Sequence, residues 1–275
     1  MAGAGLAGCE GGITEALPAS GKIAHPAIVS LNPCSDAILA EVTAPGQLLA
    51  VSHYSHDPAS SSMDLAAARR FRAVSGSVEE VAALAPDVVV AGAFLAPATR
   101  TALERLGMRV VTLDMPADLA ASRAQVRALA AMAGEPGKGE ALVARMEAAQ
   151  ARAAPPESWQ PRPALVWESG GIVAGNTTLI ADLLHKAGFA SGAAARGLSQ
   201  ADYLPLERML ADPPQVILTV GDAVSEGDRM LRHPALEALR HTHKAALASS
   251  LVWCGGPTVP RALERLAQVR KGLGS

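Results

Sequence analysis

Aromatic side chains stand at or just after the ends of several strand-like runs in this 275-residue chain, although only 3% of its residues are Phe, Trp or Tyr. The rings concerned are Tyr54, Phe94, Trp167, Trp253 and, in a nearby loop, Tyr203. Because the carboxyl ends of parallel strands form a ligand crevice, we expect these rings to hold a large, flat or apolar ligand between two lobes. Any one ring at such a position is more often part of a core, so the prediction depends on the whole set.

A second feature is a segment that occurs twice, as "SVEEVAALAPDVVVAG" at 77–92 and as "PLERMLADPPQVILTVG" at 205–221. In each copy a carboxylate, Glu79 or Glu207, stands seven positions ahead of a Pro and a β-branched run. Glu is favoured in the first turn of any helix because it opposes the macrodipole, but a matched pair in two halves favours a shared function. The sequence does not tell whether Glu79 or its neighbour Glu80 faces outward.

Histidines occur in two groups that could serve a metal site. His53, His56 and Asp57 have a spacing that could bind a metal ion, and His241 with His243 forms an HxH pair. Such clusters on loops and helix surfaces are usually solvated, so we expect no metal site.

No nucleophile elbow, P-loop or HExxH motif is present in the sequence, and "GAGLAG" fits GxGxxG without a preceding strand. We therefore expect a protein that is not an enzyme and has no cofactor. An α/β enzyme with an unrecognised site is the alternative of another class.

The composition argues against nucleic acid and a membrane-spanning segment. The chain is 49% apolar and 18% charged, which is typical of a globular protein. With 24 basic against 26 acidic residues the net charge is −2, so no global field attracts nucleic acid. No uninterrupted apolar stretch reaches the roughly 18 residues that span a bilayer.

The elements that must position these residues follow an alternating pattern. Short apolar runs alternate with helical segments through residues 27–117, which predicts a parallel α/β lobe. Residues 118–155 are rich in Ala, Arg, Glu and Leu and predict a connecting helical segment, and alternation resumes at 156–275 as a second α/β lobe. Residues 1–26 are predicted to form an N-terminal leader or tail.

The cysteines leave two questions open. Cys34 and Cys254 are too far apart in sequence for a disulfide to be deduced, and free thiols are the more common outcome. Cys9 ends "LAGC", which resembles a lipoprotein lipobox, but the eight residues before it lack a basic region and a full apolar region. Either a longer signal has been trimmed or the match is chance.

The chain as a whole resembles a known family. "AIVSLNPCSDAILAEV", "VSHYSHDP", the two repeated segments and the connecting helix together look like the substrate-binding proteins of cobalamin, iron-siderophore and haem ABC importers. The resemblance implies two Rossmann-like lobes with parallel sheets, joined by one long connecting helix, with the ligand in the cleft between them. It also implies a periplasmic monomer whose Glu79 and Glu207 dock on the permease, which works with an ATPase.

Within that family the resemblance is closest to the cobalamin-binding member, in which residues matching Tyr54 and Cys34 face the corrin. Two departures affect the ligand. The cleft Trp expected just before Glu79 is missing, and "VWCGGP" replaces an acidic and basic pair in the last cleft loop. A corrinoid is the first choice of ligand, and a ferric siderophore or haem is the alternative.

Overall fold

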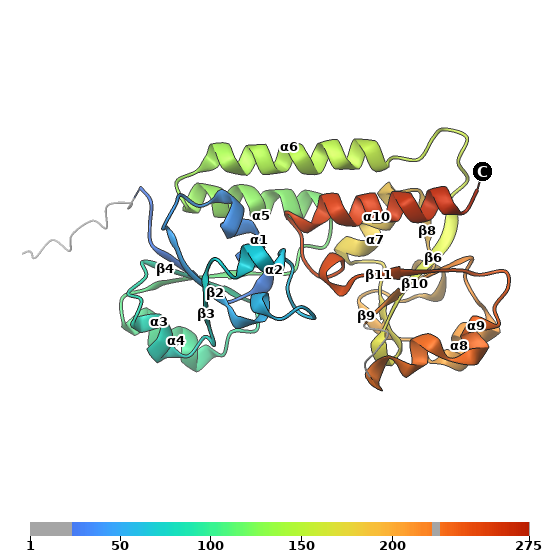
Figure 1. The fold of residues 1–275 in the computed structure, drawn as a ribbon, viewed down its shortest axis with the longest axis horizontal. Coiled ribbons are helices and arrows are strands. Elements are labelled where there is room, and N and C mark those ends of the chain that lie inside the picture. The colour runs from blue at the N-terminus through green and yellow to red at the C-terminus, as the bar shows by residue number, and fades with distance from the viewer. Residues whose placement is uncertain (1–23, 222–225, 275) are drawn as a thin grey trace, which may run out of the picture.

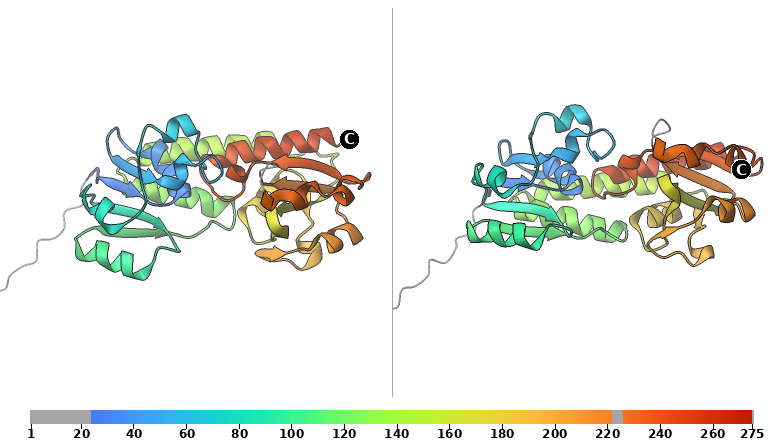
Figure 2. Two further views of the ribbon diagram at one scale, coloured as in Figure 1. Left: turned by 60° about the horizontal axis from the view of Figure 1, so that its bottom comes forward. Right: turned by 90° about the horizontal axis from the view of Figure 1, so that it is seen from below.

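The computed structural model describes residues 24–221 and 226–274. Two α/β lobes lie side by side, and a layer of long helices runs along one side of both (Figures 1 and 2). Two α/β lobes are the expected fold class, which the structure confirms. Among the described helices, none combines the length and apolar character needed to cross a bilayer.

The N-terminal lobe is built on a five-stranded parallel sheet in the order β3-β2-β1-β4-β5. Its strands are β1 (Ile28–Ser30), β2 (Leu48–Ser52), β3 (Arg72–Val74), β4 (Val88–Gly92) and β5 (Arg109–Leu113). Its helices are α1 (Pro33–Val42), α2 (Leu65–Ala68), α3 (Val78–Ala82) and α4 (Pro97–Arg105). The central strands β1 and β4 are Val- and Ile-rich and buried on both faces, as a covered parallel sheet requires.

The C-terminal lobe has a six-stranded sheet in the order β11-β10-β6-β7-β9, with β8 beside β6. Its strands are β6 (Arg162–Glu168), β7 (Ile172–Ala174), β8 (Phe189–Ser191), β9 (Ala201–Tyr203), β10 (Val216–Val220) and β11 (His243–Leu247). Its helices are α7 (Leu179–Lys186), α8 (Leu206–Ala211), α9 (Pro234–Glu237) and α10 (Thr258–Gly272).

The expectation of a parallel sheet is wrong for part of this lobe, because β7 pairs antiparallel with both β6 and β9. The chain reverses in a single turn directly after β6. Gly170 and Gly171 make that turn with φ values of 72° and 83°, in the left-handed region that glycine adopts without steric cost.

The connecting segment also differs from the expected single helix. It forms α5 (Leu119–Met132) and α6 (Pro136–Ala153), separated at Gly134, which has a φ of 78°, and Glu135. The left-handed Gly and the following Pro end one helix and begin the next. Helix α5 packs on α1 of the N-terminal lobe and along α6, and its first residue reaches the other lobe, because the Leu119 N–H donates to Oδ2 of Asp182 in α7 at 2.9 Å. Helix α6 contacts α1 as well and packs along α10 (Figure 1).

One hydrophobic core continues through both lobes. A single buried cluster joins Ile28 and Val90 of the N-terminal sheet, Met146 of α6, Leu218 of the C-terminal sheet and Leu263 of α10. The helix layer therefore connects the lobes through packed side chains as well as through the chain.

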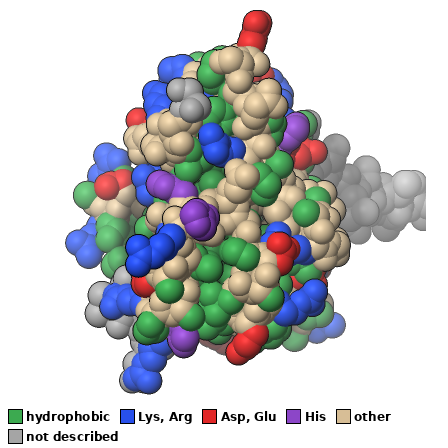
Figure 3. Space-filling model, turned by 90° about the vertical axis from the view of Figure 1, so that its right-hand side faces the viewer, with side chains coloured by type: hydrophobic (Ala, Val, Ile, Leu, Met, Phe, Trp, Pro, Cys, Tyr) green, Lys and Arg blue, Asp and Glu red, His purple; other side chains and the backbone are tan. Residues whose placement is uncertain are grey.

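The surface at the end of the C-terminal lobe mixes side-chain types. Basic, acidic and hydrophobic side chains are interspersed there, and no continuous basic face is seen from this side (Figure 3).

Candidate ligand-binding cleft

A cleft of about 750 Å³ lies between the lobes at the carboxyl ends of the strands. The N-terminal lobe contributes residues of the segments 32–34, 92–94 and 113–116, which follow β1, β4 and β5. The C-terminal lobe contributes Glu168, β7 and the segment 249–254. The cleft thus occupies the place at which doubly wound α/β proteins bind their ligands.

Exposed aromatic rings line this cleft from both sides. Phe94 is 95% exposed, and Tyr54 and Trp253 are each 50% exposed, which are high values for large apolar side chains. Tyr203, 62% exposed, lies opposite Ile172 in the β7–β9 pair, and Ile172 lines the cleft. Directly opposed residues of an antiparallel pair share a face, so Tyr203 is on the same face of the sheet as Ile172. Tyr203 itself is not among the residues that line the cleft.

Trp167 is a correction to the predicted ring set. It is fully buried in the core of the C-terminal lobe, and its indole N–H donates to the carbonyl oxygen of Leu204 at 3.2 Å. Successive side chains of a strand point to opposite faces, so the next residue of β6, Glu168, faces the cleft instead.

Glu168 is half-buried and holds the ring of Trp253. The indole N–H of Trp253 donates to Oε2 of Glu168 at 3.2 Å. Burial raises the pKa of the Glu168 carboxyl, and the hydrogen bond from Trp253 lowers it by less. The sequence carries no distinct signal for Glu168, which directly follows the ring of Trp167 in β6.

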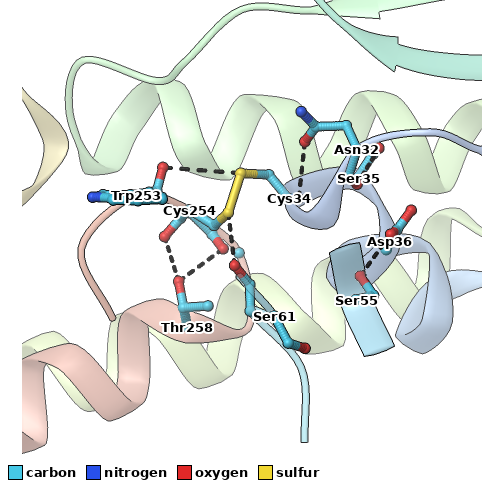
Figure 4. The surroundings of a disulfide bond; sticks show 12 residues. Asn32, Cys34, Ser35, Asp36, Ser55, Ser61, Trp253, Cys254 and Thr258 are labelled. Carbon is cyan, nitrogen blue, oxygen red and sulfur yellow. Dashed lines mark hydrogen bonds between the residues drawn. A yellow bond between two sulfur atoms is a disulfide. The ribbon is translucent and has the colours of Figure 1, made fainter. Parts of the chain in front are cut away.

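A disulfide joins the two lobes at the cleft. Cys34, near the start of α1, is bonded to Cys254, in the segment before α10, with a Cα–Cα distance of 5.0 Å (Figure 4). Both residues line the cleft, and the hydroxyl of Ser62 lies 2.8 Å from the sulfur of Cys254. Disulfides persist in oxidising compartments such as the bacterial periplasm, so this bond is compatible with a periplasmic location.

The two glycines after Cys254 fix the same segment to the N-terminal lobe. A Cβ on Gly255 would lie 2.2 Å from the hydroxyl of Ser122, and one on Gly256 would lie 2.6 Å from Ile38. The N–H of Gly256 donates to the Ser122 hydroxyl at 2.9 Å. The segment that carries Trp253 is therefore held against the N-terminal lobe, although β11, the strand before it, belongs to the sheet of the other lobe.

Asp36 lies behind the cleft and is buried in α1. Its Oδ2 accepts a hydrogen bond from the Ser55 hydroxyl at 2.6 Å (Figure 4). The same oxygen accepts from the Ser52 N–H at 3.0 Å. Burial raises the pKa of Asp36 to about 8, because the carboxylate is removed from water. Since Ser52 and Ser55 flank Tyr54, the acid positions the turn that carries a cleft ring. A carboxyl within the apolar run of α1 was the sequence signal for it.

Residues 28–250 match the family model described as periplasmic binding protein. The chain belongs to the periplasmic binding protein family. The resemblance found in the sequence is thereby confirmed, and the family implies a periplasmic location and work with the permease and ATPase of an ABC importer. No curated protein sequence matches the chain at a significant level.

Solved structures of binding proteins share the fold at low sequence identity. The haem-binding protein RhuT from Roseiflexus sp. RS-1 has 23% identity and a TM-score of 0.69, with 89% of this chain and 97% of that chain covered. The vitamin B12-binding protein BtuF of Vibrio cholerae has 20% identity and a TM-score of 0.69, with 91% and 99% covered. Helicobacter pylori Ceue, with Ni(II) bound, has 18% identity and a TM-score of 0.67, with 91% and 87% covered.

Each lobe of this binding protein carries one of the two repeated carboxylates. Glu79 in α3 and Glu207 in α8 are both exposed, and the two helices lie one on each lobe, on the side away from α6 (Figure 1). Glu80 is bonded to the turn just before its own helix. Its Oε2 accepts hydrogen bonds from the N–H of Ser75 at 2.6 Å and from the Ser75 hydroxyl at 2.5 Å. Glu79 is therefore the outward carboxylate of the two.

Two of the histidines that could have bound a metal contact backbone carbonyl groups instead. Rings of His53 and His56 lie within 3.3 Å and 3.1 Å of the carbonyl oxygens of Val74 and Ala68. Within the described residues no group of three His, Cys, Asp or Glu could hold a metal ion. Cys9 lies outside the described residues.

Proposed function

We propose that this binding protein captures a flat metal chelate of the tetrapyrrole type, with a corrinoid as the first candidate, and acts as a monomer that delivers it to an ABC importer. The observation that carries the proposal is the interlobe cleft of about 750 Å³ with the exposed rings of Tyr54, Phe94 and Trp253. Flat apolar faces of a ligand stack on such rings, and a cleft of this volume is within the usual range for small-molecule sites.

Haem and ferric siderophores are the alternatives within the family. RhuT is a haem-binding protein and BtuF a vitamin B12-binding protein, and both share this fold. An α/β enzyme remains the alternative of another class. Lipid attachment at Cys9, which would anchor the protein to a membrane, stays a prediction.

Visible titration of the purified protein tests the ligand. Cyanocobalamin, haemin and a ferric siderophore are added separately, and a shifted absorption spectrum reports binding. We expect saturable binding of the corrinoid, and about fivefold weaker binding by Tyr54→Ala or Trp253→Ala, because each ring contact is worth roughly 1 kcal/mol. Leu106→Ala, which removes an exposed apolar side chain outside the cleft, serves as the control. Unchanged affinity in both ring variants would show that the ligand binds elsewhere.

Permease docking is tested separately from ligand binding. We propose that Glu79 and Glu207 pair with basic side chains of the permease, one for each lobe. Glu79→Ala with Glu207→Ala should reduce transport in vesicles holding the cognate permease and ATPase at least tenfold, and reversal of both charges to Lys should reduce it further. Ligand affinity should not change, because neither residue lines the cleft.

The matched control for docking removes two exposed carboxylates from the helix layer, with Glu147→Ala and Glu264→Ala. This variant carries the same net charge as the docking variant. If both double variants transport at the normal rate, the repeated Glu is only a shared preference for helix starts.

A further inference from the structure

The charges that face the cleft have one sign. Asp114 and Glu168 line it, while no Lys, Arg or His side chain is among the described residues that do so. The two carboxylates come from opposite lobes, since Asp114 follows β5 and Glu168 ends β6. A ligand held between the lobes is therefore exposed to acidic groups from both sides.

Glu168 is the more constrained of the two carboxylates. It ends β6, which lies between β10 and β7 in the sheet, and its side chain is half-buried. The indole of Trp253 occupies one acceptor position of its Oε2. An ionised carboxylate offers about four acceptor positions, so Glu168 keeps capacity for donors on a ligand.

The peripheral groups of a metal chelate decide how it interacts with these carboxylates. Amide or amine N–H groups donate charge-assisted hydrogen bonds to them, which are stronger than neutral ones. Peripheral carboxylates would place like charges together in a partly dry site without a compensating cation, which is unfavourable. The flat ring itself stacks on the aromatic side chains in either case.

We propose that Glu168, with Asp114 on the opposite lobe, makes the cleft selective for metal chelates whose periphery carries amide or amine N–H groups, and against chelates whose periphery carries carboxylates. The proposal rests on the proposed function, because it assumes that a flat chelate binds in this cleft. It makes Glu168 a specificity-determining residue, and it ranks amide-bearing corrinoids above carboxylate-bearing haem.

Two pairs of probes separate charge from ring shape. Cobinamide and cobyrinic acid share the corrin ring but carry amide and carboxylate arms, respectively. Haemin and its dimethyl ester share the porphyrin ring and differ in two carboxylates. Dissociation constants at pH 7.5 come from visible titrations of the wild-type protein and of Glu168→Gln. Gln keeps an oxygen acceptor for the Trp253 indole, so the ring keeps its tether.

The wild-type protein should bind cobinamide at least tenfold more tightly than cobyrinic acid, and the ester more tightly than haemin. Glu168→Gln should reduce both ratios at least fivefold, mainly through tighter binding of the acidic probes. Asp114→Asn, a change at an exposed position, should act in the same direction by a smaller factor. The control Glu157→Gln removes an exposed carboxylate far from the cleft and should leave both ratios unchanged.

The outcomes distinguish the two proposals. If none of the four probes binds, the proposed function fails, and the selectivity proposal fails with it. If the acidic probes bind as tightly as their neutral counterparts, or if neither Glu168→Gln nor Asp114→Asn changes the ratios, the selectivity proposal alone is wrong.

Discussion

Replacing Asp36 with Asn is expected to abolish most of the pH dependence of the folding stability between pH 5 and pH 8. In the folded protein the pKa of Asp36 is about 8, whereas its ordinary value is 3.8. The folded state therefore binds a proton that the unfolded state releases in this range. Stability is greatest below the unfolded pKa and is lost as the pH rises through the folded one.

The expected size follows from the same linkage. At 1.36 kcal/mol per pH unit, the wild-type free energy of unfolding should fall by about 4 kcal/mol from pH 5 to pH 8 through this one group. Asn cannot titrate, yet its oxygen can accept from the Ser52 N–H and the Ser55 hydroxyl, as the acid does. Urea unfolding at a series of pH values measures the effect.

Glu41→Gln is the control for Asp36, because Glu41 is an exposed carboxylate of the same helix. It should leave the pH profile unchanged. A wild-type profile that is flat over this range, or one that Asp36→Asn does not alter, would show that the buried carboxyl is not protonated in the folded protein.

Removing the interlobe disulfide is expected to have an effect of similar size. Cys34 and Cys254 are separated by 220 positions, so the bond closes most of the chain into one loop. The chain-entropy relation gives about 5 kcal/mol of stabilisation for a loop of this length. Cys34→Ser with Cys254→Ser should lose this amount, and a dithiol reductant should destabilise the wild-type protein equally while leaving the double variant unaffected.

Denaturant midpoints with and without reductant measure this prediction. Cys9→Ser is the matched control, since it removes a cysteine and leaves the pair intact. It should unfold like the wild-type protein. A double variant as stable as the oxidised wild-type protein would mean that the packing of Gly255 and Gly256 against the N-terminal lobe already holds the segment.

The N-terminal lobe could be predicted from the sequence because local pattern and tertiary role agree there. Its Val-rich runs, with helices between them, form parallel strands as expected. The pattern was insufficient after β6, where Gly170 and Gly171 reverse the chain and make the sheet mixed. It was also insufficient at Gly134, where a long helical composition divides into an antiparallel pair of helices.

The site was predictable in its location but less so in its members. Strand ends indicated the cleft, and Tyr54 and Phe94, which follow β2 and β4, lie in it. Trp253 lies in it too, but its apolar run forms a 3-10 turn at Ser249–Leu251 and not the expected strand. Which face of a strand a side chain occupies depends on one step along the chain, and this step separates buried Trp167 from Glu168 in the cleft. No local pattern links Cys34 to Cys254, because their pairing depends on how distant segments meet.

The core shared through α6 and α10 has a consequence for how the two lobes respond to stress. Each lobe would leave part of this apolar cluster in water if it folded without the other, so neither half is an independent thermodynamic unit. Heat or denaturant should act on the molecule as a whole, and damage to a residue in one half lowers the melting temperature of both. The cleft is thus an indentation in a single cooperative body.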